Sequence, residues 1–220
     1  MENERREIIA RYKKLYTGIV SDAMDKMGLR SHLLPSYLRP LKENMVVAGY
    51  AFTGHGEIST NTADNDNQIR FSMLESIRPD DVPVWDCGGS MDCAHWGGMM
   101  TRSTRQAGGI GAVIDGGVRD VNDIVAQGFP VFYRFYSAGS SIGRWNIISY
   151  QKPITIGGVE IHPGDFVYGD IDGVLVVPAD KITAVLEKAE AMAHKEDEMG
   201  ADMDKNGLGV RAAYSKYGTI

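Results

Sequence analysis

The chain has 220 residues, 43% of them hydrophobic, and a formal net charge of −6 at pH 7. This composition can supply the core of one globular domain, and the basic residues are too scattered for a nucleic-acid-binding surface. No apolar stretch approaches the ~18–20 residues that span a membrane, and the charged first residues do not form a signal peptide. With Cys87 and Cys93 as the only cysteines, we expect a cytoplasmic protein with free thiols.

The N-terminal segment, residues 1–44, is predicted to contain helices. Apolar residues recur at helical spacing from residue 4 onward. Thr17-Gly18 is predicted to interrupt this pattern. A second short helix would then start near Ser21 or Asp22 and end at Gly28.

Residues 45–178 form the predicted core, and 179–220 a C-terminal helix and tail. The core pattern predicts strands at 45–56, 80–89, 110–115 and 129–135, with helices within 62–77 and over 99–107 and 121–128. This alternation favours a partly parallel sheet. Gly-Gly, Pro-Gly and Asp-Gly turns over 153–178 are typical of antiparallel hairpins, and a charged amphipathic helix follows over 180–198. We therefore expect one α/β domain over residues 1–220.

The stretch "AVIDGGVRDVND", residues 112–123, places an Arg and an Asp between a predicted strand and a predicted helix. One interpretation is structural. Asp120 would be the N-cap of the helix, Asp123 an acid in its first turn, and Arg119 a partner for a surface carboxylate.

The alternative interpretation is a ligand site. Open α/β sheets bind ligands at the carboxyl ends of their strands, and Gly116 and Gly117 would permit close approach to the backbone. Upstream, "HWGGMM" (95–100) offers a second glycine pair before a helix, whose first N–H groups suit an anion. A guanidinium and a lone carboxylate beside such turns fit an anionic ligand and a hard cation such as Mg²⁺.

The motifs "WGGMM", "GIGAVIDGGVRD" and "PGDFVYGDIDGVLVVP" together resemble the RraA-like family, and the similarity runs through most of the chain. "TGIVSDAMDKMG", "VAGYAFT" and the terminal "YSKYG" extend it. The resemblance implies a β/β/α swivelling core with flanking helices. It also implies ring-shaped homotrimers, sometimes paired into homohexamers. The family includes 4-hydroxy-4-methyl-2-oxoglutarate/4-carboxy-4-hydroxy-2-oxoadipate aldolases and regulators of ribonuclease activity.

The same resemblance implies roles for particular residues. Arg119 would contact the keto or enolate oxygen of a 2-oxo acid. Backbone amides of Gly98, Met99 and Met100 would hold the substrate carboxylate. Asp120 would be the direct ligand of Mg²⁺ or Mn²⁺.

An acid on the C-terminal helix of a neighbouring subunit would hold metal-bound water. Glu196 is the nearest match, and Glu198 is an alternative. One departure concerns Gly98, because many aldolases of the family carry an acid twenty residues before the Arg-Asp pair. Asp92 or Asp123 could compensate for the missing carboxylate, and the departure leaves the particular aldolase substrate open.

These expectations lead to a lyase that cleaves a 4-hydroxy-2-oxo acid to pyruvate and a carbonyl product, with oxaloacetate decarboxylation as a companion activity. The metal would act as an electron sink, and a metal-ordered water as the base. Two alternatives stay open: a non-catalytic regulator that binds a protein partner, and a related lyase or dehydratase acting on a sugar-derived acid.

Other residue groups favour structural interpretations. "CGGSMDCAH" (87–95) lacks the spacing of a zinc site. For His95, a packed histidine is weighed against a substrate contact, and for His55 a tight bulge against a site contact. Asp170 and Asp172 are typical of a hairpin turn, and Arg102 and Arg105 of a solvated helix face.

Overall fold

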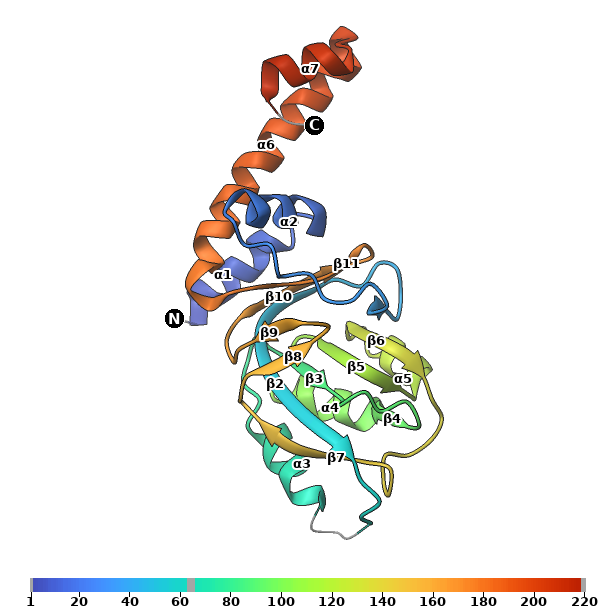
Figure 1. Cartoon of the computed structure of the whole chain (residues 1–220). Coiled ribbons are helices and arrows are strands. Elements are labelled where there is room, and N and C mark those ends of the chain that lie inside the picture. The colour runs from blue at the N-terminus through green and yellow to red at the C-terminus, as the bar shows by residue number, and fades with distance from the viewer. Residues whose placement is uncertain (1, 63–65, 219–220) are drawn as a thin grey trace.

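A computed structural model describes residues 2–62 and 66–218. It confirms the α/β expectation, with a strongly curved mixed sheet whose strand order is β1-β6-β5-β3-β2-β10-β11; β4 also pairs with β5, and β7 with β2 (Figure 1). The strands are β1 (Arg39–Pro40), β2 (Val47–Ile58), β3 (Asp81–Asp86), β4 (Ala94–Trp96), β5 (Ala112–Val118), β6 (Val131–Tyr136), β7 (Trp145–Tyr150), β8 (Ile154–Ile156), β9 (Val159–Ile161), β10 (Phe166–Asp170) and β11 (Gly173–Val177).

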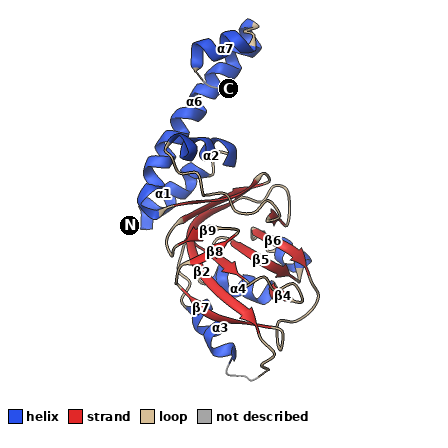
Figure 2. Ribbon diagram, in the orientation of Figure 1, coloured by secondary structure: helices blue, strands red, loops and turns tan. Residues whose placement is uncertain are grey.

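The predicted change from parallel to antiparallel pairing is confirmed. β2, β3, β5 and β6 pair in parallel, whereas β10 pairs antiparallel with β2 and β11, and β8 with β9. The helices are α1 (Glu2–Tyr12), α2 (Thr17–Lys26), α3 (Asp66–Glu75), α4 (Gly98–Gln106), α5 (Val121–Ala126), the 3₁₀ turn Ala179–Lys181, α6 (Ile182–Asn206) and α7 (Val210–Tyr217). Figure 1 and Figure 2 show α1, α2 and α6 beside β10 and β11, and α3, α4 and α5 beside the remaining strands of the sheet.

Buried apolar side chains of the described residues form three clusters. One lies between the sheet and α3, α4 and α5, and includes Trp85, Ile114 and Ile124. A second joins α1, α2 and α6 to β10 and β11. The third fills the opposite sheet face beneath the β8–β9 hairpin. The parallel strands are thus covered on both faces, as their continuous apolar runs require.

The prediction that Thr17-Gly18 separates two helices is wrong. Thr17 begins α2, and the preceding residues form the break. Asp170 stabilises this start, because its carboxylate accepts hydrogen bonds from Thr17 N at 2.8 Å and Thr17 Oγ1 at 2.7 Å. The helix N-terminus is therefore capped from the β10–β11 hairpin, a contact that the local sequence does not encode.

The glycine pair of "GGVRD" is also not a turn. Gly116 and Gly117 lie inside β5, where the register shifts against β6 and where β4 pairs with Gly117. A Cβ at Gly116 would lie 2.4 Å from His95 Nδ1, and one at Gly117 would lie 2.3 Å from the Cys93 carbonyl oxygen. The two glycines allow the segment of β4 to pack directly on the end of β5.

The C-terminal helix is longer than predicted. α6 runs to Asn206, ends at the left-handed Gly207 and is followed by α7. The first half of α6 packs through Val185, Leu186 and Ala189, whereas its second half and α7 extend away from the rest of the chain (Figure 1). Among the described residues, none of the helices is long and apolar enough to cross a membrane.

The packing at Gly116 predicts a specific loss of stability. Gly116→Ala should lower the free energy of unfolding by roughly 1–3 kcal/mol, because the added methyl group overlaps His95 and Cys87. Gly200→Ala is the matched control. It lies within α6 with open space around it, and should raise stability by roughly 0.5–1 kcal/mol. Denaturant titration measures both, and equal effects would contradict the packing role of Gly116.

Candidate active site

A small cavity of about 150 Å³ lies at the carboxyl ends of β4, β5 and β6. It brings together the residues that follow these strands and one side chain of α3. Its lining consists of Arg70, Ala94, His95, Trp96, Gly97, Met99, Met100, Arg119, Asp120, Ser140, Ser141 and Ile142. The predicted Arg-Asp pair and the predicted amide-bearing segment therefore share one cavity.

Asp120 occupies the N-cap position of α5 but does not cap that helix. Its backbone is left-handed, with φ 57° and ψ 34°, and its side chain makes no capping hydrogen bond. Its Oδ2 instead accepts a hydrogen bond from Gly98 N at 3.1 Å. The interpretation of Asp120 as a side-chain cap is therefore wrong, because a left-handed residue at this point turns its carboxylate towards α4. Such a conformation costs free energy and is concentrated at functional sites.

Arg119 lies beside this carboxylate and is half-exposed. Its Nε is 3.7 Å from Asp120 Oδ2, and its backbone N donates to the Trp96 carbonyl at 3.0 Å. The guanidinium has no shorter ion pair among the described side chains, which leaves it available to a ligand oxygen.

The N-terminus of α4 forms the facing wall. Gly97 is its extended N-cap, and Gly98, Met99 and Met100 are its first three residues, whose N–H groups have no intrahelical acceptor. Gly98 N donates to Asp120, whereas the amides of Met99 and Met100, two residues of the cavity lining, have no acceptor among the described residues. A Cβ at Gly97 would lie 2.8 Å from Asp120 Oδ2, which explains why this close approach needs glycine.

Asp123 lies next to Gly98 but is not part of the cavity lining, so its role as a substitute carboxylate remains a prediction. A Cβ on Gly98 would lie 2.3 Å from Asp123 Oδ2. Asp123 is itself held by Arg102 Nη2 and by Gln127 Nε2 at 3.1 Å. The Asp123 carboxylate therefore fills the space next to Gly98. Asp92, the other residue considered as a substitute, is exposed and absent from the cavity lining.

His95 is both buried and part of the cavity wall. Its Nδ1 accepts a hydrogen bond from Gly117 N at 2.8 Å, and its Nε2 is 3.6 Å from Cys93 Sγ. Burial, with a further contribution from the charge of Arg70, lowers the pKa of His95 to about 4. The imidazole is therefore neutral near pH 7. The interpretation of His95 as a packed histidine is confirmed, and its contact with a substrate remains a prediction.

Sequence reasoning missed Arg70, a charged residue of the cavity lining, together with Ser140, Ser141 and Ile142 of the loop after β6. Arg70 comes from α3, and its Nη2 donates to Ser141 Oγ at 3.2 Å. Its Nε is buried and has no hydrogen-bond partner. The pattern of the predicted helix gave no signal for Arg70, because its position depends on a contact with Ser141, 71 residues away in the chain.

Glu196 and Glu198 do not reach this cavity within one chain. Both lie on the part of α6 that extends away from the sheet (Figure 1). Glu196 accepts a hydrogen bond from the Tyr16 hydroxyl, and Glu198 pairs with His194 at 3.4 Å. Their assignment to a neighbouring subunit's site remains a prediction.

The remaining candidates lie elsewhere. His55 Nδ1 is 2.8 Å from Asp86 Oδ2, at a β2–β7 register shift between His55 and Gly56, so the bulge interpretation is confirmed. Asp170 caps α2, and its Oδ1 accepts a hydrogen bond from Asp172 N at 2.9 Å within the hairpin turn.

Cys87 and Cys93 are free and buried, and burial raises the pKa of both thiols. Among the described side chains, no three His, Cys, Asp or Glu residues converge as a metal cluster.

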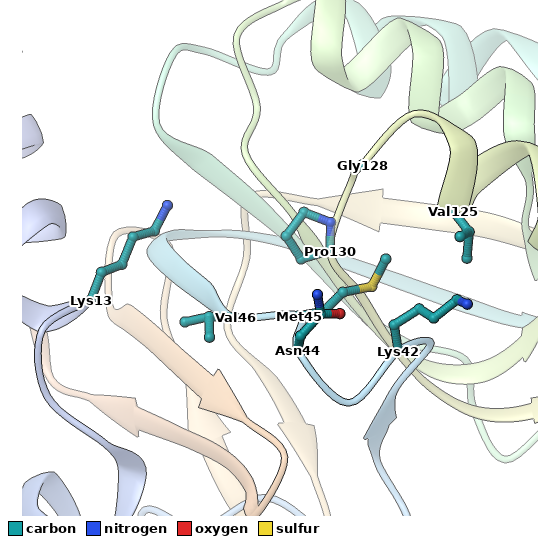
Figure 3. A pocket seen from close by; sticks show the side chains of 8 residues that line it. All are labelled: Lys13, Lys42, Asn44, Met45, Val46, Val125, Gly128 and Pro130. Carbon is teal, nitrogen blue, oxygen red and sulfur yellow. The ribbon is translucent and has the colours of Figure 1, made fainter.

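A larger cavity of about 710 Å³ lies near the opposite ends of the parallel strands. Figure 3 shows Lys13 and Lys42 on either side of the Asn44–Val46 segment, with Val125, Gly128 and Pro130 completing the wall. Its lining contains no carboxylate or imidazole. The smaller cavity around Arg119 and Asp120 is the better candidate for chemistry.

Comparison with known proteins gives a consistent picture. The model of the RraA-like family, described as aldolase/RraA, matches residues 17–176. A protein of Halalkalibacterium halodurans named "Putative 4-hydroxy-4-methyl-2-oxoglutarate aldolase" is 32% identical over 210 residues, covering 96% of this chain and 95% of its own.

Two solved structures share the fold. One, described among novel cellulases from microbes associated with the gut ecosystem, is 39% identical with a TM-score of 0.84, covering 88% of this chain and 86% of its own. The other is RraAS2 of Streptomyces coelicolor, described as an unusual member of the RNase ES inhibitor RraA family. It is 26% identical with a TM-score of 0.77, covering 90% of this chain and 96% of its own.

The lowered pKa of His95 predicts a pH dependence of stability. Between pH 6.5 and about 4, the unfolded chain binds a proton that folded His95 does not, so stability falls as the pH drops through this window. The loss attributable to His95 should be on the order of 3 kcal/mol. Denaturant titrations across pH 4–7 should show a flatter profile for His95→Asn. The control His194→Asn, at an exposed position of α6, should keep the wild-type slope. Parallel profiles for wild type and His95→Asn would contradict the buried neutral imidazole.

Proposed function

The chain belongs to the RraA-like family, and on this premise we propose that it is a divalent-metal-dependent lyase. It would cleave a 4-hydroxy-2-oxo acid between C3 and C4 to give pyruvate and a carbonyl product. One observation carries the proposal. A guanidinium, a carboxylate in a left-handed backbone and the free amides of a helix N-terminus surround one small cavity.

The donor set fits a hard divalent cation. Asp120 is half-exposed, and its Oδ2 is oriented by Gly98 N while Oδ1 makes no hydrogen bond in the described structure. Mg²⁺ and Mn²⁺ favour carboxylate oxygens, and Mg²⁺ commonly keeps several waters and takes only one or two carboxylates from the protein. Bound by Asp120, such an ion would supply Lewis-acid polarisation of the substrate's keto oxygen.

The chain's own residues bind and orient the substrate. The amides of Met99 and Met100, at the positive end of the α4 dipole, would hold its 1-carboxylate. Arg119 would donate to the 2-keto oxygen and stabilise the negative charge that develops there as the C3–C4 bond breaks. A water molecule in the cavity would take the proton of the C4 hydroxyl, whose carbon becomes a carbonyl, and the enolate would then take up a proton at C3 to give pyruvate. The same enolate would arise from oxaloacetate by loss of CO₂.

The titles of the two solved structures mention cellulases and an RNase inhibitor family, so glycoside hydrolysis and regulation are two other activities to compare with the lyase. Glycoside hydrolysis generally uses two carboxyl groups on either side of the bond, roughly 5–9.5 Å apart. Among the described residues that line the cavity, Asp120 supplies the only carboxylate. The left-handed backbone of Asp120 brings its carboxylate into the cavity, and such a strained conformation is understandable where the carboxylate serves chemistry. Both points favour the lyase.

Metal removal tests the first part of the proposal. Dialysis against a chelator should abolish pyruvate release from 4-hydroxy-2-oxo acids and from oxaloacetate, and Mg²⁺ or Mn²⁺ should restore it. Borohydride in the presence of pyruvate should not inactivate the enzyme, because the mechanism uses no lysine Schiff base. A coupled pyruvate assay measures both, and full activity in excess chelator would exclude the metal mechanism.

Substitution of the Arg-Asp pair tests the second part. Asn tolerates a left-handed backbone and keeps an acceptor for Gly98 N, so Asp120→Asn should change stability by less than about 0.5 kcal/mol. Turnover should nevertheless fall by roughly 100-fold or more, because the anionic oxygen is lost. Arg119→Lys should also lose roughly 100-fold, as expected when a preorganised donor with fixed geometry is removed.

Arg105→Lys is the matched control for these variants. Arg105 lies on the exposed face of α4, outside the cavity, and should retain wild-type turnover. Near-wild-type rates for both Asp120→Asn and Arg119→Lys, on a substrate that the parent cleaves, would remove the pair from the reaction.

A further inference from the structure

We propose that Arg70 binds a second carboxylate of the substrate, distal to its 2-oxo group, and so selects dicarboxylic over monocarboxylic 4-hydroxy-2-oxo acids. This inference rests on the proposed function. It assigns a specificity-determining role to a residue of α3, on a different cavity wall from Arg119, Asp120 and the start of α4.

The first observation is that Arg70 has no counter-charge. Among the described residues it takes part in no salt bridge, and Ser141 Oγ is its hydrogen-bond acceptor. Its Nε is buried and unpaired. A guanidinium removed from water in this way is costly unless an anion accepts its remaining hydrogen bonds.

The second observation is that a further cation shares the cavity. Burial lowers the pKa of Arg70, and the nearby charge of Arg119 acts in the same direction. Two guanidinium groups and the amide end of α4 face a cavity with Asp120 as its lining carboxylate. In a chain of net charge −6, this local excess of positive charge is suited to an anion with more than one acidic group.

The third observation is that Arg70 is held in place. Its Nη2 donates to Ser141, which is itself buried in the loop after β6. With Nε buried and one N–H of Nη2 bonded to Ser141, Nη1 and the second N–H of Nη2 are left for a ligand in the cavity, and such a guanidinium edge binds a carboxylate through parallel hydrogen bonds. The 1-carboxylate and keto oxygen are already assigned to α4 and Arg119. A distal carboxylate is therefore the group of such a substrate that Arg70 would receive.

Kinetics with matched substrates tests the assignment. 4-Hydroxy-2-oxoglutarate and 4-hydroxy-2-oxopentanoate differ by a distal carboxylate in place of a methyl group. The wild type should prefer the dicarboxylate in kcat/KM. Arg70→Gln should lower kcat/KM for the dicarboxylate by roughly 10- to 100-fold, as expected for loss of a charge-assisted hydrogen bond, and change the monocarboxylate by less than about 3-fold.

Two further variants complete this experiment. Arg70→Lys keeps the charge without the fork and should lie between wild type and Arg70→Gln. Arg78→Gln removes an exposed arginine outside the cavity and should match the wild type. An equal loss on both substrates in Arg70→Gln, with an unchanged melting temperature, would overturn the proposal in favour of a general positioning role.

A binding measurement keeps the inference separable from the lyase assignment. Calorimetry in the presence of Mg²⁺ compares 2-oxoglutarate with 2-oxopentanoate, which differ in the same way and need no cleavage. Tighter binding of 2-oxoglutarate to the wild type, lost in Arg70→Gln, supports Arg70 even if neither hydroxy acid is cleaved. Equal affinities in the wild type would overturn it.

A last experiment tests whether Arg70 binds the substrate's own carboxylate or a free anion. Inorganic phosphate is added to the reaction with 4-hydroxy-2-oxopentanoate. No acceleration is expected, because the anionic group belongs to the substrate. Acceleration that disappears in Arg70→Gln would make Arg70 a site for free phosphate and would overturn the proposal.

Discussion

The close approach of two backbone segments, residues 93–98 and 116–120, is the constraint on which the candidate site depends. Glycines on both segments make it possible. His95 packs against Gly116 and the Cys93 carbonyl against Gly117, at distances that a Cβ atom on either glycine would prevent. Gly97 in the same way leaves room for the Asp120 carboxylate. The hydrogen bonds from Gly117 N to His95 and from Arg119 N to Trp96 then fix the register of the two segments. As a result, the end of β5 and the start of α4 meet, although more than twenty residues separate their interacting groups.

The same contact explains the unusual backbone of Asp120. A right-handed residue at this position would continue into α5 and direct its carboxylate along that helix. The left-handed conformation instead turns the carboxylate towards Gly98 N, where it satisfies one of the free amides of α4. The strain is thus offset partly by a hydrogen bond to a helix N-terminus, which also favours the negative charge. The neutral His95 beneath β5 adds no positive charge to this arrangement.

The sequence allowed the layered α/β architecture to be predicted, because strand and helix periodicities and the change of turn type after residue 150 are local signals. The prediction that the glycines of "GGVRD" form a turn was wrong. Glycine occurs both in turns and where two backbone segments pack closely, and the sequence alone does not distinguish the two. β4 is only three residues long and carried no usable periodicity. Arg119, Asp120 and the α4 amides could be proposed from their place at strand ends. Arg70 could not, because it is oriented by Ser141, a contact between residues 71 positions apart.

The departure at Gly98 is consistent with this geometry. Asp123, anchored by Arg102 and Gln127, occupies the space into which any side chain at position 98 would project. An acid there would place a second carboxylate against Asp123 and would require the Asp123 side chain to turn away. Glycine at 98 instead keeps its N–H close to Asp120, and among the described residues the cavity lining then has a single carboxylate and two guanidinium groups. On the proposed function, this balance of charge favours a polyanionic ligand, and the cation that Asp120 would bind would contact the ligand's oxygens rather than a cluster of protein carboxylates.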